Sequence, residues 1–496
     1  MYLNVEEVES ALEDIAGAAN AAFTEHIELP EPTWEQRTCH AIRIHDDGHT
    51  ARTGVFVIGG VHAREWGSPD ILIHFAQRLA DAYRDGTGIT EGGAAFDAND
   101  IARIVRILDV VVFPQVNPDG RHYSMTESPL WRKNRRPAEP DTACVDDGYG
   151  GGPGVDINRN YDFLHDFGTY LSPDATLVVS DEPCDPTYHG ASGGSEPETR
   201  NVKWLANHVG SVEYLLDVHS FGEWILYPWG DDEDQSDTPT ENFRNAAWDG
   251  RRGVADDNYG EHVAASDLTH HVELATAMFD GIKAAHGREY KVEQSSMLNA
   301  FADFRYITTG TAHDWAFSRH LIDPSDRKIY GYTVEWGPER ADSETSFHPD
   351  YPDMVPIIEE VTAGLLSFCL EVADRTSPAL EIDPGKWALV VYILFGVTND
   401  GGGVVIMPGT GPIPVDPWGP LRRLTTAERA KVLEVVSSMR PVRPGSVANA
   451  AEAVRAEVEN ALGRSTVASL RKAFVVRPEL ARVGERLAGR VGRRDR

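Results

Sequence analysis

The residues of this sequence best suited to metal chemistry are His62, Glu65 and His219. His62 and Glu65 follow the apolar run 53–60, which ends in two glycines, and His219 ends the apolar run 214–219. Such runs are typical of buried strands that end in tight loops, so the three side chains can converge at strand ends. Two imidazoles and one carboxylate give zinc three ligands and leave a fourth position for water. The pattern therefore predicts a catalytic zinc site.

Other residues that suit an active site occur along the chain. Arg132 follows a turn-rich segment, Asn158 and Arg159 are neighbours, Tyr306 precedes a glycine, and Glu335 lies near the end of a strand-like alternation. Taken alone, each is most often a surface or half-buried residue, and the His-x-x-Glu spacing is itself a weak signal. Their occurrence in one chain favours an active site.

In the type and order of these residues, the chain resembles the zinc carboxypeptidases of the carboxypeptidase A/B family. The resemblance covers about three quarters of the chain, from a predicted amphipathic helix at 5–16 to a predicted helix at 354–370. Between them, short apolar strands alternate with helix-like segments such as 68–83 and 270–286. We therefore predict an α/β fold with a mixed, mostly parallel central sheet, helices on both faces and ligands at the strand ends.

The resemblance implies the roles of the residues around the metal. It makes His62, Glu65 and His219 the ligands of one Zn²⁺ per chain. It makes Asp156 the carboxylate that orients a ligand histidine and raises its basicity. It makes Glu335 the general base that assists attack of zinc-bound water on the C-terminal peptide bond and passes the proton to the leaving amine.

The resemblance also implies how the substrate is held. Arg132 matches the residue that polarises the scissile carbonyl and stabilises its oxyanion. Asn158, Arg159 and Tyr306 match the group that binds the free C-terminal carboxylate, and Arg64 matches a further arginine of the site. A planar guanidinium meets a carboxylate through two parallel hydrogen bonds, so an arginine suits recognition of a chain end. We expect exopeptidase action.

Three residues match the pocket for the substrate's terminal side chain. By the resemblance, His313 lies at the pocket floor, and Arg305 and Thr333 lie at two other pocket positions. A histidine and an arginine there favour acidic or polar C-terminal residues, because a buried guanidinium is costly unless a carboxylate meets it. In the alternative interpretation, Arg305 points away from the pocket or pairs with Asp303. Spacing does not fix the direction of a loop side chain, so both stay open.

Three functions are compatible with these residues. The first is a zinc metallocarboxypeptidase that acts on peptides or proteins with a free C-terminal carboxylate. The second is a zinc amidase or peptidase that acts on cell-wall peptides or N-acyl amino acids. The third is a non-catalytic domain that binds peptide ends, but the presence of Glu335, Arg132 and all three ligands argues against it.

Composition and length indicate a globular chain with more than one part. The chain has 496 residues, of which 41% are apolar and 25% charged. We predict a catalytic domain over 1–377 and a mainly helical extension over 378–496. The extension contains an apolar stretch at 387–397, about half of the roughly 20 residues that a membrane span needs. Then follow a Gly/Pro-rich passage at 399–421 and three helix-like segments at 426–438, 446–462 and 467–488.

The charge of the chain is uneven. The formal net charge is −32, yet residues 441–496 contain 12 Lys plus Arg and 6 Asp plus Glu. So acidic a chain is not expected to bind nucleic acid. We expect peptide or protein C-termini as substrates. The basic helices are predicted to dock on the acidic body or on a partner, and the oligomeric state is not predicted.

An acidic stretch at 231–237 opens a polar segment that runs to about 266. This segment is longer than the corresponding connection of the family. We interpret it as a solvated surface loop near the mouth of the site, in preference to a calcium site. A second long connection, 141–153, is rich in Asp and Gly.

The location of the protein in the cell is predicted from its N-terminus and its cysteines. The first residues lack the basic start and apolar core of a signal peptide, and four cysteines are few for this length. The cytoplasm is therefore the expected compartment, and secretion by a route without a recognisable signal peptide is the alternative. By the resemblance, Cys144 and Cys184 lie where some relatives form a disulfide.

Overall fold

The computed structural model describes residues 1–46, 52–138, 142–254, 257–298 and 305–376. One compact unit of the chain ends at Ser377. The predicted C-terminal extension over 378–496, with its apolar stretch and its basic helices, lies outside the described residues, as does Asp303.

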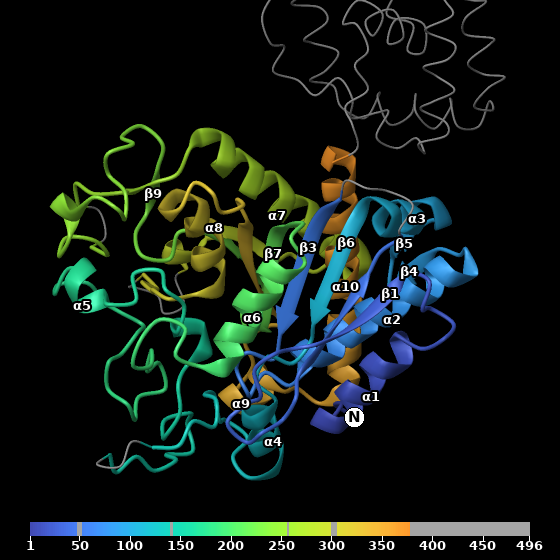
Figure 1. Ribbon diagram of the computed structural model, residues 1–496, viewed down its shortest axis with the longest axis horizontal. Helices are drawn as coiled ribbons and strands as arrows, with labels where there is room; N and C mark the ends of the chain where they lie inside the picture. The colour runs from blue at the N-terminus through green and yellow to red at the C-terminus, as the bar shows by residue number, and fades with distance from the viewer. Residues whose placement is uncertain (47–51, 139–141, 255–256, 299–304, 377–496) are drawn as a thin grey trace, which may run out of the picture. The chain divides into compact units, whose positions relative to one another are not determined.

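A mixed sheet forms the centre of the described unit (Figure 1). Its strands are β1 (Thr24–Glu28), β2 (His40–Ile44), β3 (Thr53–Gly59), β6 (Leu108–Phe113), β7 (Val212–Ser220), β8 (Trp224–Tyr227), β11 (Lys291–Gln294) and β12 (Tyr330–Trp336). They lie in the order β1-β2-β6-β3-β7-β12-β8-β11. The central strands β6, β3, β7 and β12 are parallel, whereas β1, β2 and β8 add antiparallel pairs. The predicted mixed, mostly parallel sheet is confirmed.

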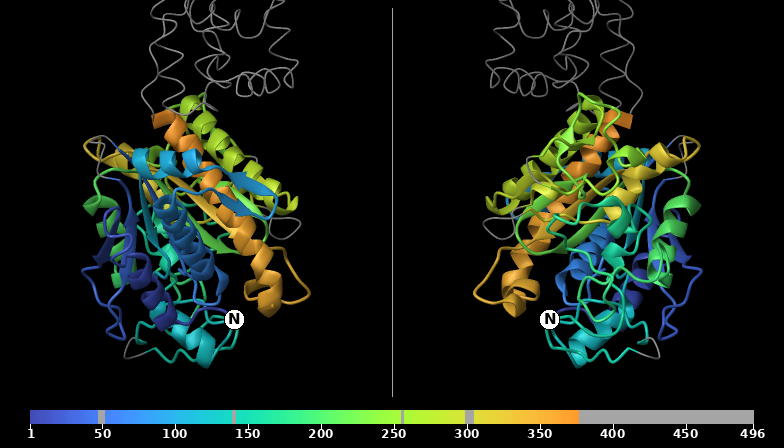
Figure 2. Two further views of the ribbon diagram at one scale, coloured as in Figure 1. Left: turned by 90° about the vertical axis from the view of Figure 1, so that its right-hand side faces the viewer. Right: turned by 90° about the vertical axis from the view of Figure 1, so that its left-hand side faces the viewer.

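Helices cover both faces of this sheet. The α-helices of the described residues are α1 (Val5–Ile15), α2 (Gly67–Asp85), α3 (Ala98–Ile107), α4 (Pro118–Thr126), α5 (Phe167–Tyr170), α6 (Pro197–His208), α7 (Ala265–His286), α8 (Ala312–Ile322), α9 (Ser343–Phe347) and α10 (Tyr351–Thr376). Along β3, Val55 and Val57 join one hydrophobic core with α1, α2, α3, α7 and α10, whereas Phe56 and Ile58 join a second core with α6 and α8. Successive strand residues point to opposite faces, so a strand buried on both faces is apolar throughout. In Figure 2, α10 (orange) lies against α7 and α2.

The structure extends some of the predicted helices. The predicted segments 5–16, 68–83, 270–286 and 354–370 correspond to α1, α2, α7 and α10. α7 begins at Ala265, five residues before its predicted start, and α10 continues to Thr376. α2 and α7 each end at a glycine in the left-handed conformation, as helices commonly do. The φ angles of Gly86 and Gly287 are 64° and 76°.

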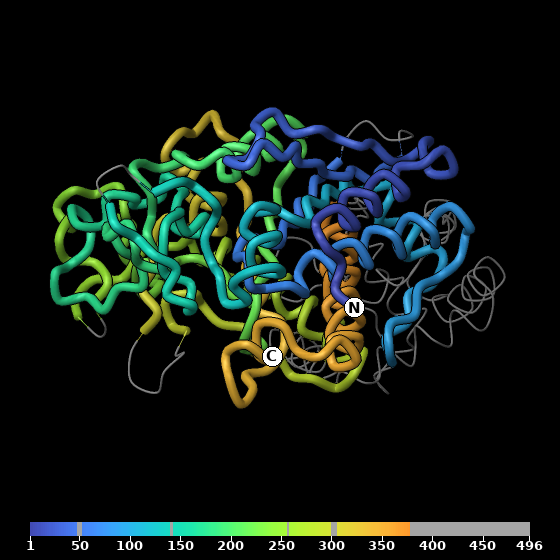
Figure 3. The backbone as a smooth tube through the Cα atoms, turned by 90° about the horizontal axis from the view of Figure 1, so that it is seen from below, coloured from blue at the N-terminus to red at the C-terminus, as the bar shows by residue number. Residues whose placement is uncertain are grey.

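Long irregular segments accompany the regular core. The described parts of 127–196 and 228–263 lie together on one side of the unit, on the left in Figures 1 and 3. A disulfide joins Cys144 to Cys184 in the first segment. Buried Lys133 donates hydrogen bonds from Nζ to the carbonyls of Pro183 and Asp185, and so fixes the same segment. None of the helices in the described part of the chain has the length and apolar character that a membrane span requires.

The prediction of a solvated loop at 231–266 is wrong for part of this segment. Asp231 and Asp232 are 0% and 1% exposed. Asp232 is buried because its oxygens accept hydrogen bonds from the backbone N–H groups of Gly253 and Glu233. The segment folds back on itself through a short parallel pair, β9 (Asp234–Gln235) and β10 (Glu261–His262). A smaller antiparallel pair, β4 (Ile89–Glu91) and β5 (Ala94–Phe96), lies elsewhere in the unit.

Candidate metal centre and active site

The three predicted metal ligands meet at the ends of two neighbouring strands. His62 and Glu65 lie in the turn between β3 and α2, and His219 lies near the end of β7. Gly60 makes this turn possible, because its φ is +61° and an added Cβ would lie 3.2 Å from Cα of Gln115. The fold therefore brings together ligands that are far apart in the sequence.

The ligand atoms face one another in a buried cluster. Oε1 of Glu65 lies 2.7 Å from Nδ1 of His62, and Oε2 lies 3.0 Å from Nδ1 of His219. The two Nδ1 atoms are 3.0 Å apart. Among the described residues, only these three form a group of potential metal ligands whose atoms all lie within 4.8 Å of one another. Two imidazole nitrogens and a carboxylate oxygen form a donor set that fits a catalytic zinc ion.

Asp156 lies directly behind His62. Its Oδ1 lies 3.1 Å from Nε2 of His62, and its Oδ2 accepts hydrogen bonds from Nε and Nη2 of Arg132 at 3.0 and 2.9 Å. The backbone holds the same group together, since the N–H of Ala63 donates to the carbonyl of Arg132 at 3.0 Å. Asp156 thus joins the ligand loop to the arginine that was predicted to act on the substrate.

The electrostatics of the cluster favour a bound cation. Burial opposes ionisation of Glu65, but the imidazoles of His62 and His219 outweigh it and hold the pKa of this carboxyl well below its ordinary value. Burial also opposes the charge of His219, but the carboxylates of Asp217 and Glu65 raise the pKa of this imidazole well above its ordinary value. The cluster therefore stabilises positive charge among its ligand atoms.

Glu335 lies beside the ligands on the next strand. β12 pairs with β7 in a register that sets Glu335 opposite His219 and Thr333 opposite Asp217. Burial raises the pKa of Glu335 to about 8, opposed by His219 and reinforced by the carboxylate of Glu65. A carboxylate of raised pKa is a stronger base than an exposed one and suits proton transfer near neutral pH.

The residues predicted to bind a C-terminal carboxylate include Asn158, whose Nδ2 lies 3.4 Å from Nε2 of His219. Arg159 is 2% exposed, and its Nη2 donates to the hydroxyl of Tyr306 at 3.2 Å. Its Nε and Nη1 donate to the carbonyls of Val178 and Asn158, which fix the plane of the guanidinium. Oδ1 of Asn158 accepts from the N–H of Ala312, at the start of α8.

Arg64 extends from the ligand loop to a different part of the site. Its guanidinium carbon lies 4.1 Å from the ring centroid of Phe347. Its Nη1 donates to the carbonyl of Tyr149 at 3.4 Å. The side chain thus connects α9 with the segment that precedes the disulfide partner Cys184.

Two of the three predicted pocket residues contact each other. Nδ1 of His313 lies 2.9 Å from Oγ1 of Thr333. Burial, together with the charges of His219 and Arg159, lowers the pKa of His313 to about 3, so its imidazole is neutral. The third residue, Arg305, forms an ion pair with Glu233 at 2.5 Å. The charge of Arg305 is thus met by an acidic residue of the segment 231–266, and the alternative pairing with Asp303 lies outside the described residues.

One residue of the site was missed by sequence analysis. Asp217 is fully buried, and its Oδ2 lies 2.7 Å from Nε2 of His219. The signal was present, because a carboxylate two residues before a ligand on the same strand shares its face.

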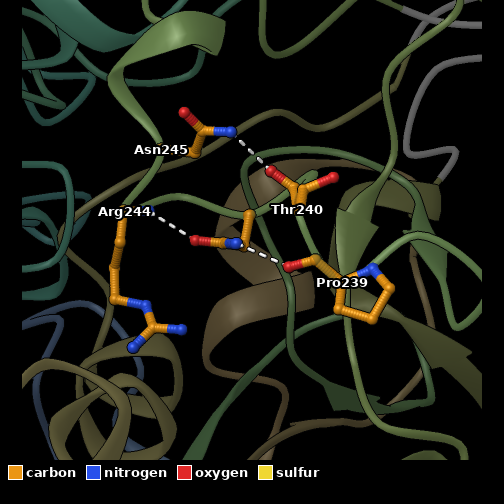
Figure 4. A pocket seen from close by; sticks show the side chains of 5 residues that line it. Pro239, Thr240, Arg244 and Asn245 are labelled. Atoms are coloured by element: carbon orange, nitrogen blue, oxygen red, sulfur yellow. Dashed lines mark hydrogen bonds between the residues drawn. The ribbon is translucent and has the colours of Figure 1, made fainter.

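The described part of 231–266 also contains an open depression lined by Pro239, Thr240, Asn242, Arg244 and Asn245 (Figure 4). Several of its polar groups bond to one another. Nδ2 of Asn245 donates to the carbonyl of Thr240, and Nδ2 of Asn242 donates to the carbonyl of Pro239. None of the predicted site residues lines it, so it is separate from the metal centre.

Comparisons with known proteins bear on this arrangement. Residues 19–364 match the zinc carboxypeptidase family. Carboxypeptidase A4 of Mus musculus is 29% identical over 198 residues, which span 40% of each chain. Carboxypeptidase B of Astacus astacus is 26% identical over 336 residues, or 67% of this chain and 86% of that protein.

Two solved structures share the fold. The thrombin activatable fibrinolysis inhibitor has a TM-score of 0.55 and 19% identity, and the match covers 75% of each chain. Carboxypeptidase A from Helicoverpa armigera has a TM-score of 0.53 and 21% identity, and the match covers 77% of this chain and 74% of that one. With a family match over most of its length, the chain belongs to the zinc carboxypeptidase family of metallohydrolases.

Proposed function

We propose that this protein is a zinc-dependent carboxypeptidase that removes the last residue of peptides or proteins with a free C-terminal carboxylate. The observation that carries the proposal is the convergence of two kinds of group at the strand ends. The cluster of His62, Glu65 and His219 lies beside Glu335, and Arg159 and Tyr306 interact electrostatically with Asp156 and Arg132, which adjoin the cluster.

The proposed cofactor is one Zn²⁺ per chain, held by the two histidines and Glu65. When bound, zinc supplies a Lewis acid that lowers the pKa of water from about 15.7 towards about 7 and polarises a carbonyl. The residues of the chain do the remaining work, namely proton transfer, charge stabilisation and orientation of the substrate.

Glu335 is the proposed general base. It takes a proton from the attacking water and delivers it to the nitrogen of the leaving amino acid as the peptide bond breaks. Its neighbour across the strands is the ligand His219, so its carboxylate lies beside the reacting atoms. A positioned base of this kind contributes about 10²–10⁴-fold to the rate.

Arg132 and Arg159 have complementary roles. Arg132, held by Asp156, stabilises the negative oxygen that develops on the scissile carbonyl. Arg159, held by Val178 and Tyr306, pairs with the terminal carboxylate. An internal peptide segment has no carboxylate there and would leave this buried guanidinium unpaired, so the site selects chain ends.

The proposed preference is for polar or acidic terminal residues, and the contacts favour polar ones. The pocket presents the neutral imidazole of His313 and the hydroxyl of Thr333. Arg305 already pairs with Glu233. An acidic side chain would have to compete with Glu233 for the charge of Arg305, whereas an amide or hydroxyl group needs only hydrogen-bond partners.

The deciding experiment is mass spectrometry of a peptide library incubated with the zinc-loaded protein. Each peptide is offered with a free and with an amidated C-terminus, and Glu335→Gln is assayed in parallel. We expect single-residue trimming of the free-ended peptides alone, and a loss of at least about 10²-fold in the variant. Trimming of amidated ends would indicate an amidase, and trimming of no peptide would indicate the binding-only function.

The compartment is a separate proposal. The disulfide between Cys144 and Cys184 favours secretion over the cytoplasm, because disulfides persist in oxidising compartments. Alkylation of native cell and medium fractions with a thiol reagent tests this. Modification of Cys144 and Cys184 in the cell fraction would support the cytoplasm, whereas protected cysteines in the medium would support secretion.

A further inference from the structure

We propose that Asp217 is a positioning residue for the metal ligand His219, whose ring it orients and whose bond to the metal it strengthens. The inference rests on the proposed zinc centre. The family resemblance supplied one such carboxylate, Asp156, and the structure places it against His62. With Asp217, each ligand histidine has a carboxylate partner of its own.

The two carboxylates contact their histidines through equivalent atoms. Oδ2 of Asp217 lies 2.7 Å from Nε2 of His219, and Oδ1 of Asp156 lies 3.1 Å from Nε2 of His62. In both rings Nδ1 faces Glu65, at 3.0 Å for His219 and 2.7 Å for His62. Each imidazole therefore lies between the ligand cluster and a fully buried aspartate.

This placement determines the position of the ring proton. A neutral imidazole that binds a metal through Nδ1 carries its proton on Nε2. Nε2 of His219 is then a donor, and it needs an acceptor. Nδ2 of Asn158 lies 3.4 Å away but cannot accept a proton, so Asp217 is the acceptor. Such a hydrogen bond fixes the tautomer and raises the basicity of the ligand.

The burial of Asp217 supports a specific role. The residue lies in β7, between β3 and β12, where a carboxylate without a partner is costly. Among the described residues, no lysine or arginine forms an ion pair with Asp217. Its oxygens have no hydrogen-bond partner in this part of the chain apart from the contact with His219. The negative charge of Asp217 therefore acts mainly on the imidazole of His219.

The strand register shows how Asp217 is placed to act through His219. Along β7, Asp217 and His219 share one face, and their partners on β12 are Thr333 and Glu335. Asp217 therefore lies one step behind the ligand, away from the general base. A change at Asp217 should weaken the metal bond first and alter catalysis as a consequence.

The test measures zinc affinity in the full-length protein by competition with a chromophoric chelator. Asp217→Asn keeps the size and an acceptor oxygen but removes the charge, and Asp217→Ala removes both. We expect the zinc dissociation constant to rise about 10-fold for Asn and up to about 100-fold for Ala. At saturating zinc, kcat should fall more than KM changes. Asp156→Asn is the reference for the equivalent contact at His62.

The matched control is Asp109→Asn. Asp109 is also a buried strand aspartate, but it accepts from Ser211 and pairs with Arg43, away from the ligands. The substitution Asp109→Asn should lower the free energy of unfolding without a change in zinc affinity. The inference is overturned if both Asp217 variants bind zinc as tightly as the wild type, with urea unfolding of each metal-free protein showing that it is folded. Failure of the wild type itself to bind zinc would contradict the proposed function instead.

Discussion

Two of the regions that contain buried carboxylates differ in their surroundings. At the metal centre, Glu65 faces two histidines, and Asp156 faces His62 and Arg132. In the segment 231–262, Asp231 and Glu261 are equally buried, but they lie next to each other. Both regions remove carboxylates from water, but the opposite charges outweigh burial only for Glu65 and Asp156, whereas Arg252 does not outweigh it for Asp231.

The comparison shows how neighbours decide the state of a buried carboxyl group. Burial acts against the charge of Asp156, but Arg132 and His62 hold its pKa well below the ordinary value. Burial raises the pKa of Asp231 to about 7 and that of Asp232 to about 8. The metal centre is therefore arranged to hold a cation, whereas the second region is arranged to hold protons.

The largest expected effect is on the free energy of unfolding, when Arg252 is replaced. Arg252 is a fully buried cation close to Asp231. It donates to the carboxylate of Asp249 and to the hydroxyl of Tyr259. Arg252→Met should lower the free energy of unfolding by about 3–5 kcal/mol, because it leaves buried groups without their charged partner. Urea unfolding at pH 8 measures this. The exposed neighbour Arg251→Met is the control, with an expected change within about 0.5 kcal/mol, and equal losses in both would contradict the prediction.

The second prediction concerns Arg132, the cation that binds Asp156 at the metal centre. Arg132→Lys keeps the charge but loses the two N–H groups that bind one oxygen of Asp156. We expect kcat/KM to fall by about 10²–10³-fold, because an oxyanion donor is removed and the ligand loop loses a contact. Steady-state kinetics with a free-ended peptide measures this. Arg135→Lys, whose guanidinium lies over Tyr123, should retain activity, and a loss equal to that of Arg132→Lys would refute the assignment.

The third effect concerns pH. The pKa of Asp231 is raised from 3.8 in the unfolded chain to about 7 by burial, so the folded state binds the extra proton between these values. Stability should therefore fall as pH rises from about 4 to about 7, with a slope of about 1.4 kcal/mol per pH unit for this group, and stay reduced above that. Asp231→Asn should remove this part of the slope and stabilise the protein at pH 8.

Urea unfolding at several pH values measures the change. The matched control is Asp237→Asn, which alters an exposed aspartate of the same segment. It should leave the pH dependence of stability as in the wild type. A slope that is the same in Asp231→Asn and in the wild type would show that Asp231 is ionised throughout.

The sequence predicted the regions that depend on local pattern. The runs that became β3 and β7 are largely apolar and buried, so His62, Glu65 and His219 were expected at or near strand ends. The pairing of Cys144 with Cys184 was also anticipated by the resemblance.

The parts that the sequence left undetermined depend on distant contacts. Asp231 resembles any loop aspartate until the fold brings Glu261 and Arg252 against it. The sequence places Asp217 on the strand face of His219, but its importance follows from the direction in which His219 turns its Nε2. Patterns of residue type predict which groups are present, whereas burial and direction come from tertiary structure.

The smallest expected effect concerns the ion pair of Arg305, a predicted pocket residue, with Glu233 of the acidic segment. Both side chains are partly exposed, so Arg305→Gln should change the free energy of unfolding by less than about 1 kcal/mol. Because Glu233 already meets this charge, the ratio of kcat/KM for peptides ending in glutamate and in glutamine should shift by less than about 5-fold. Glu233→Gln should raise that ratio instead, since it removes an acidic competitor for the charge of Arg305. A fall of about 100-fold in Arg305→Gln would show that Arg305 binds an acidic terminal residue directly, and that its charge belongs to the pocket and not to the acidic segment.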